Sequence, residues 1–161
     1  MPVRRGSGED WRALRAIRLE ALRDTPEAYG ETYESAAEFS DDQWREAATT
    51  WSYFIAERDG DVVGMVSGGE HDKYPGTLWM YSLYVTPSAR GRGVADQLVD
   101  AVTAWARDGG VSELYLHVTM RAQRAKAFYT RIGFEATGEH FEMSRDPSIE
   151  LVTMVRSLVD A

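Results

Sequence analysis

The sequence predicts an α/β (α+β) fold with one mixed, mostly antiparallel sheet of about six to seven strands, flanked by about four helices. Three observations predict this class. Two apolar segments flank Asp59-Gly60-Asp61, a turn sequence typical of an antiparallel hairpin. A single strand–helix–strand crossover follows, and such a crossover joins parallel strands. Two further apolar segments near the end of the chain predict another antiparallel pair, so the sheet is expected to be mixed.

The N-terminal half predicts one short strand, two helices and the hairpin. Trp11 and Leu14 begin an apolar pattern of helical spacing, and Pro26 ends it. Ser40 and Gln43 form a capping-box sequence at the start of a second helix. The expected elements are a strand at 3–5, helices at about 11–25 and 41–48, and strands at 51–58 and 62–67.

The C-terminal half predicts the crossover and two closing strands. Gly109-Gly110 and Gly133 are typical helix ends, because glycine adopts the left-handed conformation at little cost. Asp146-Pro147 predicts a loop between the last two strands. The expected elements are strands at 77–85, 113–119, 134–141 and 149–155, and helices at 93–107 and 121–131.

Length and composition limit the classes of protein to which the chain can belong. Its 161 residues, 43% of them apolar, suit a single domain over residues 1–161. No apolar run is long enough for a membrane span and the N-terminus lacks a signal-peptide core, so we expect a cytoplasmic protein. The net charge of -8 argues against non-specific nucleic-acid binding. The absence of cysteine and the scattered positions of the three histidines predict no disulfide, no thiolate nucleophile and no metal site.

The segment 83–95 is the strongest functional motif. An apolar strand runs into a helix start that contains two glycines, in the order Arg90, Gly91, Arg92, Gly93, Val94, Ala95. Glycines leave the backbone amides open, and a helix N-terminus attracts anions, so the motif predicts a diphosphate cradle. By itself it is also compatible with an ordinary strand-to-helix turn. A P-loop is disfavoured, since no Gly-Lys-Ser/Thr follows.

Two motifs together resemble the GNAT superfamily of acyl-CoA-dependent N-acetyltransferases. Residues 90–95 fit the Arg-x-x-Gly-x-Ala form of that family's pyrophosphate loop. Residues 125–134 are similar to its Ala-x-x-aromatic-Tyr-x-x-x-Gly-Phe segment, and Tyr129 is the tyrosine. The resemblance covers nearly the whole chain. It implies the GNAT fold with the fourth and fifth strands splayed apart, and acetyl-CoA as the cosubstrate in direct acetyl transfer to an amine.

The chain departs from the family pattern at two places. Ala122 stands where the family usually has Asn, and residues 79–83 on the fourth strand offer no carboxylate. Both departures leave a second hypothesis open: a catalytically inactive CoA-binding regulatory or interaction module of the same fold. Binding of acetyl-CoA without turnover would favour this module.

The resemblance also implies which residues contact the cosubstrate. The backbone of the fourth strand pairs with the pantetheine as an added strand, and the glycine loop holds the diphosphate. Arg124 is expected near the ribose phosphate, with a solvated helix-face arginine as the alternative. The expected cofactor-binding residues are Leu83, Tyr84, Val85, Arg90, Gly91, Arg92, Gly93, Val94, Ala95, Arg124 and Phe128.

The resemblance implies a catalytic proton donor, and side-chain chemistry and position suggest a candidate base. Tyr129 is expected beside the CoA sulfur, where its phenol protonates the departing thiolate. Glu70 is the candidate base, because an ordinary amine must lose a proton before attack. Glu31, Glu34, His71 and His117 have the right side-chain chemistry as well, although His117 is expected to be a satisfied sheet histidine. A water chain or a neutral acceptor stays open.

The acceptor site is expected where two segments overhang the thioester in this family. These are the half-ordered lid after the first helix, residues 25–39, and the loop at 140–148. The lid is rich in Tyr and Glu, and such a surface attracts cations. The expected substrate-binding residues are Tyr29, Glu31, Tyr33 and Glu34. The predicted acceptor is a small cationic amine or a protein amine, and the protein is expected to be a monomer or homodimer.

Overall fold

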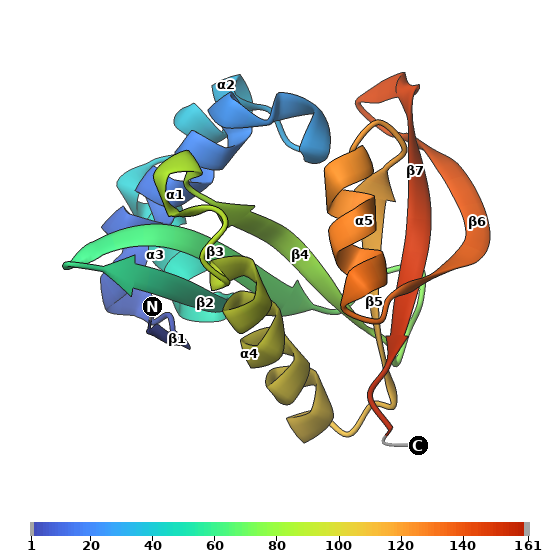
Figure 1. Cartoon of the computed structure of the whole chain (residues 1–161). Helices are drawn as coiled ribbons and strands as arrows, with labels where there is room; N and C mark the ends of the chain where they lie inside the picture. Colours follow the sequence, from blue (N-terminus) through green and yellow to red (C-terminus); the bar gives the residue numbers. More distant parts are fainter. Residues whose placement is uncertain (1, 160–161) are drawn as a thin grey trace.

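The computed structural model describes residues 2–159 and contains one seven-stranded sheet in the order β1-β2-β3-β4-β5-β7-β6 (Figure 1). The strands are β1 (Val3–Arg5), β2 (Ser52–Arg58), β3 (Asp61–Gly69), β4 (Leu78–Val85), β5 (Glu113–Thr119), β6 (Glu135–Met143) and β7 (Asp146–Ser157). Every neighbouring pair is antiparallel except β4 and β5, which are parallel. The predicted mixed, mostly antiparallel sheet is confirmed.

Helices cover both faces of the sheet (Figure 1). The α-helices are α1 (Trp11–Asp24), α2 (Tyr33–Ala37), α3 (Asp41–Thr50), α4 (Val94–Asp108) and α5 (Gln123–Arg131), with 3-10 turns η1 (Gly8–Asp10), η2 (Pro26–Ala28) and η3 (Pro87–Ala89). The segment expected as a half-ordered lid therefore contains η2 and α2. Within residues 2–159, no helix combines the length and apolar character needed to cross a membrane.

Two apolar cores lie on opposite faces of the sheet, because neighbouring residues of a strand point in opposite directions. Ile55 and Met65 pack with α1 and α3, whereas Ala56 and Val66 pack with α4. The helices therefore hold β2, β3 and β4 between two layers. This packing fixes β4, the strand that borders the candidate site.

Strands β4 and β5 separate after two residue pairs. Leu78 pairs with Leu114 and Trp79 with Tyr115, and no later pair joins these strands within the described chain. The register between β3 and β4 shifts near Ser82, whose φ of 58° is left-handed, as in a β-bulge. The separation opens the gap that Figure 1 shows between β4 and α5. The predicted splay of the fourth and fifth strands is confirmed.

The connection between β6 and β7 is shorter than the sequence suggested. We expected a loop over residues 140–148, but β6 continues to Met143 and pairs there with Asp146, the first residue of β7. Asp146-Pro147 therefore begins a strand, and the prediction of a loop there was wrong. Pro147 is tolerated because the start of a strand beside a turn can lack a backbone donor. A tight hairpin thus replaces the expected overhanging loop.

Replacing Gly6 by alanine is expected to lower the free energy of unfolding by about 1–3 kcal/mol through overpacking. A Cβ at Gly6 would lie 2.0 Å from Tyr53 Cε2. The Tyr53 ring is fully buried and its hydroxyl donates to the Ser7 carbonyl at 2.6 Å, so the ring cannot easily move. Gly30→Ala is the control, because its Cβ would meet no atom within 4 Å. Equal urea midpoints for the two variants would contradict the prediction.

Candidate active site

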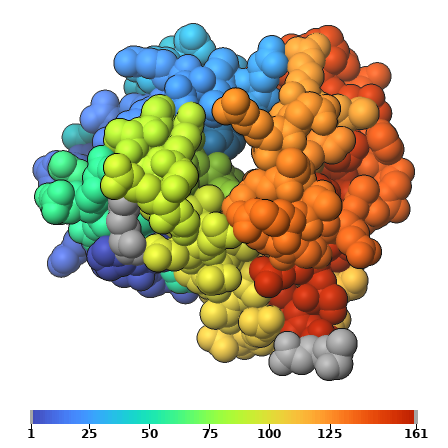
Figure 2. All heavy atoms as spheres, in the orientation of Figure 1, coloured from blue at the N-terminus to red at the C-terminus, as the bar shows by residue number. Residues whose placement is uncertain are grey.

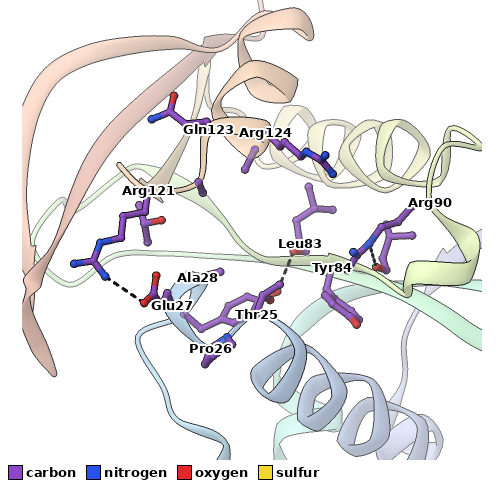
Figure 3. A pocket seen from close by; sticks show the side chains of 15 residues that line it. Thr25, Pro26, Glu27, Ala28, Leu83, Tyr84, Arg90, Arg121, Gln123 and Arg124 are labelled. Atoms are coloured by element: carbon purple, nitrogen blue, oxygen red, sulfur yellow. Dashed lines mark hydrogen bonds and ion pairs between the residues drawn. The ribbon is translucent and has the colours of Figure 1, made fainter.

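A cleft of about 820 Å³ lies where β4 and β5 have separated. Figure 2 shows the hollow between the blue, yellow-green and orange segments of the chain. Its walls come from η2, the second half of β4 and the start of α5, and Figure 3 shows their side chains. Three arginines line it: Arg90, Arg121 and Arg124. Arg90 and Arg121 are ion-paired with acids, whereas Arg124 has no ion pair among the described residues and is available to an anionic ligand.

Side chains, rather than a neighbouring strand, bind two carbonyls at the cleft edge of β4. Tyr29 donates its hydroxyl to the Leu83 carbonyl at 3.2 Å, and Arg90 Nε donates to the Val85 carbonyl at 2.9 Å. Arg90 also pairs with Asp24 at 2.7 Å. Leu83 and Val85 thus present backbone polar groups to the cleft. An extended ligand that contains amide groups can pair with such an edge as an added strand.

The glycine motif forms a smaller hollow of about 250 Å³ at the N-terminus of α4. Gly91 and Gly93 have φ angles of 78° and 80°, and a Cβ at either position would meet open space. The hollow is lined by Val85, Ala89, Arg90, Gly91, Gly93, Val94, Ala95, Asp96, Phe128 and Arg131. A helix start with open backbone amides is a site for an anion.

Nearly all the expected cofactor-binding residues line the cleft or this hollow. Tyr84 borders the cleft with its backbone rather than its hydroxyl. The hydroxyl donates to Asp24 at 3.2 Å, on the side of the sheet that α1 covers. Arg92 is the exception, because it is exposed and lines neither space. Arg131, which the motif analysis did not single out, lines the hollow and pairs with Asp96 at 3.0 Å.

An inner pocket of about 360 Å³ adjoins the cleft and shares with it Ala28, Tyr29, Leu83, Thr119, Ala122 and Ala125. Tyr129 lines this pocket from α5. Its ring packs against Phe128 and Phe134, and its hydroxyl has no hydrogen-bond partner among the described residues. Burial raises the pKa of Tyr129 well above its ordinary value, with a smaller contribution from Tyr29. Tyr129 therefore keeps its proton at neutral pH.

Ala122 lies at the junction of the cleft and the inner pocket. It occupies the N-cap position of α5, where its side chain makes no capping hydrogen bond. Its carbonyl accepts from the backbone amide of Lys126 at 3.0 Å, so the helix begins without the usual asparagine. The methyl side chain leaves this junction open and uncharged.

The lid is fastened to the other side of the cleft by two arginines. Arg145, in the β6–β7 turn, donates to the carbonyls of Pro26 at 2.6 Å and Tyr29 at 2.9 Å. Arg121 pairs with Glu27 at 3.2 Å across the cleft, as the dashed line in Figure 3 marks. The tight hairpin thus holds the lid in place over the inner pocket.

The expected acceptor residues are distributed over two places. Tyr29 lines the inner pocket, and Glu31 lies next to it through its pairing with Arg18. Tyr33 and Glu34 line a separate hollow of about 410 Å³ on the far side of the lid. The short helix α2 causes this separation, because it begins at Tyr33 and turns the chain away. Two lid acids, Glu27 and Glu31, are paired with arginines, so the lid is less negative than its composition suggests.

Glu70 and His117, two of the candidate bases, lie in different environments. Glu70 is exposed and follows β3 at the end where β4 and β5 still pair, so it does not line the inner pocket. His117 lines the pocket, and its Nε2 is buried with no partner among the described residues. Its Nδ1 lies 3.3 Å from Thr153 Oγ1. No metal-ligating cluster of three or more acids or histidines occurs in residues 2–159.

Acid is expected to destabilise the protein through His117. Burial, with a smaller effect of His71, lowers the pKa of His117 to about 4 from its model-compound value of 6.5. Between these pH values His117 is protonated in the unfolded chain but stays neutral in the native protein. The free energy of unfolding therefore falls as pH drops from 6.5 towards 4. His117→Gln should reduce this loss by about 1–2 kcal/mol, a value discounted for partial exposure. Urea unfolding at pH 7 and pH 4.5 checks this, and equal losses in both proteins would contradict it.

The splayed strands with a cleft between them and a glycine turn at the start of α4 define the class of fold. The particular family follows from comparison with known proteins: the model of the Acetyltransferase (GNAT) family matches residues 13–134. The chain belongs to that family.

Curated relatives match part of the chain. It is 36% identical over 93 residues to N-acetyltransferase 8 of Rattus norvegicus, covering 55% of this chain and 41% of that protein. It is 33% identical over 108 residues to an uncharacterized N-acetyltransferase of Mycobacterium bovis, covering 65% of each. The chain thus spans about two fifths of the length of the mammalian relatives that it matches.

Solved structures match the chain over nearly its whole length. The yncA protein of Salmonella typhimurium, solved with its cofactor acetyl-CoA, superposes with a TM-score of 0.78 at 21% identity, covering 100% of this chain and 95% of that one. A GCN5-related N-acetyltransferase of Kribbella flavida gives a TM-score of 0.75 at 23% identity, covering 97% and 96%. At these identities the likeness establishes the fold.

Proposed function

We infer that this protein is an N-acetyltransferase that moves an acetyl group from acetyl-CoA directly to an amine. One observation supports the inference: Tyr129 lines an inner pocket that adjoins the cleft where β4 and β5 separate. A proton donor in this pocket suits a reaction between a ligand in the cleft and a second ligand in the pocket. Membership of the GNAT family supports the same reaction.

The residues around the cleft fit acetyl-CoA. The amides beside Gly91 and Gly93 would hold the diphosphate, since a Cβ at either glycine would occupy that open space. The backbone of Leu83 and Val85 would pair with the pantetheine, and Arg124 would lie near the ribose phosphate. When bound, acetyl-CoA supplies an acetyl group activated as a thioester.

Tyr129 is proposed to give its proton to the sulfur as the carbon–sulfur bond breaks, and to regain a proton from water. Its raised pKa keeps the phenol protonated until it is needed. Backbone N–H groups near the splay would polarise the carbonyl of the thioester. Positioning of the two ligands in adjoining spaces supplies much of the remaining rate enhancement.

The proton of the amine has no carboxylate acceptor in the inner pocket, since the described lining residues include neither Asp nor Glu. Glu70 as the base stays a prediction, and its position outside the lining requires a water relay. Otherwise the amine enters in its neutral form. For an amine with a pKa near 10.4, that form is about one molecule in 2,500 at pH 7.

The test is release of free CoA thiol from acetyl-CoA in the presence of an amine panel of neutral, cationic and zwitterionic members. We expect acceptor-dependent thiol release, together with the acetylated amine as product. Binding of acetyl-CoA in a thermal-shift assay without release by any acceptor would contradict the function and favour the inactive CoA-binding module.

A further inference from the structure

A buried arginine lies beside the proposed acceptor pocket. Arg18, from the middle of α1, lines the inner pocket together with Ser82 and Tyr129. Its side chain is 10% exposed, whereas the other ion-paired arginines of residues 2–159 are 48–61% exposed. Burial lowers the pKa of Arg18, but a guanidinium stays charged in proteins. The inner pocket therefore has a permanent cation in its wall.

The polar groups around Arg18 satisfy this cation poorly. Nη1 donates to Ser82 Oγ at 2.9 Å, and Nη2 lies 3.5 Å from Glu31 Oε1, at the limit of a hydrogen bond. Nε is buried and has no partner among the described residues, and the Tyr29 ring lies 4.9 Å from Cζ. A guanidinium has five N–H donors, so Arg18 has unused capacity.

Other arginines in the protein are paired more closely. Arg90 lies 2.7 Å from Asp24, and Arg4 lies 2.8 Å from Asp10 and also contacts Glu57. Burying a charge is costly unless hydrogen bonds and a close counter-ion compensate it. Arg18 is the most buried of these arginines and has the longest ion pair, which is the reverse of what stability alone would favour. A ligand carboxylate in the inner pocket would supply the missing charge.

We propose that the acceptor carries a carboxylate as well as its amine, and that Arg18 binds this carboxylate. The acceptor is then a small amino acid rather than the purely cationic amine suggested by the lid. The pocket volume of about 360 Å³ suits a small molecule, and Met80, Leu116, Met143 and Leu151 give it apolar walls. An apolar amino-acid side chain fits these walls. This inference rests on the proposed acetyl transfer.

The test compares matched acceptors in the thiol-release assay: L-amino acids with apolar side chains, their amides and the amines that lack the carboxyl group. In the wild-type protein we expect kcat/KM for the acids to exceed that for the amides by about 10- to 100-fold, the value of charge-assisted hydrogen bonds. Arg18→Met should abolish this preference, and Arg18→Lys should retain part of it. Acetyl-CoA binding should be unchanged in both variants, which also reports that they fold.

Each result decides between the two proposals. Equal or better use of the amides and simple amines by the wild type would overturn the carboxylate inference and leave acetyl transfer standing. If Arg18→Met slows acids and amides by the same factor, Arg18 only holds the β4 bulge and the inference fails. If no acid, amide or amine releases thiol although acetyl-CoA binds, both proposals are overturned.

Discussion

Tyr129→Phe is expected to lower kcat by about 10²–10⁴-fold, the usual contribution of a positioned general acid. The KM for acetyl-CoA should change little, because the ring remains packed against Phe128 and Phe134 at centroid distances of 5.5 and 5.7 Å. The substitution removes only the hydroxyl of a residue that lines the inner pocket. Steady-state thiol release with a saturating acceptor measures both constants.

Tyr81→Phe is the matched control for this variant. Tyr81 also lines the inner pocket, but its hydroxyl donates to the Glu70 carbonyl at 3.0 Å and is thus already engaged. We expect Tyr81→Phe to retain kcat within a few-fold. If Tyr129→Phe kept the wild-type kcat, or if both variants lost activity equally, Tyr129 would not be the proton donor.

The mixed sheet could be predicted from local sequence signals, and its splay from the resemblance of two motifs to the GNAT family. Asp59-Gly60 marks a hairpin with few alternatives, since both residues adopt left-handed φ angles, 53° and 85°. The β6–β7 connection could not be predicted in the same way. Asp146-Pro147 is a strong turn signal, but the turn lies just before it and Pro147 occupies the strand start, where a missing N–H costs nothing.

The glycine turn at residues 90–95 could be predicted because its residues are consecutive in the chain. Gly91 and Gly93 adopt positive φ angles, a conformation that glycine in such a turn predicts. The inner pocket is assembled from α1, the lid, β4, β5, α5 and the last hairpin, and no local pattern shows which side chains meet there. Arg18 illustrates the difficulty. The sequence of α1 contains several arginines, and only the tertiary packing shows that Arg18 is the buried one.

The charge of the lid could not be predicted from composition alone. Taken as free charges, its acids would attract a cation. Glu27 pairs with Arg121 at 3.2 Å and Glu31 lies 3.5 Å from Arg18, so two of the four lid acids have an arginine nearby. Composition alone could not show these contacts, because Arg121 lies 94 residues from Glu27 in the sequence and meets it only in the folded chain.

Gly93→Ala is expected to weaken acetyl-CoA binding by about 10- to 100-fold, the loss of one or two charge-assisted hydrogen bonds from the cradle amides. The added methyl would occupy the open side of the loop, and the φ of 80° would strain alanine by about 1–2 kcal/mol. Gly110→Ala is a matched control. It has a φ of 81°, its Cβ would also meet open space, and it lies at the other end of α4.

The two glycine variants should therefore lose similar free energy of unfolding in urea, while only Gly93→Ala loses affinity in calorimetric titration with acetyl-CoA. This comparison separates backbone strain from ligand binding, because the strain is common to both positions and the cradle is not. Equal acetyl-CoA affinities for the two variants would show that the diphosphate lies elsewhere. A loss of affinity confined to Gly93→Ala would assign the anion to the N-terminus of α4, since no other property distinguishes the two substitutions.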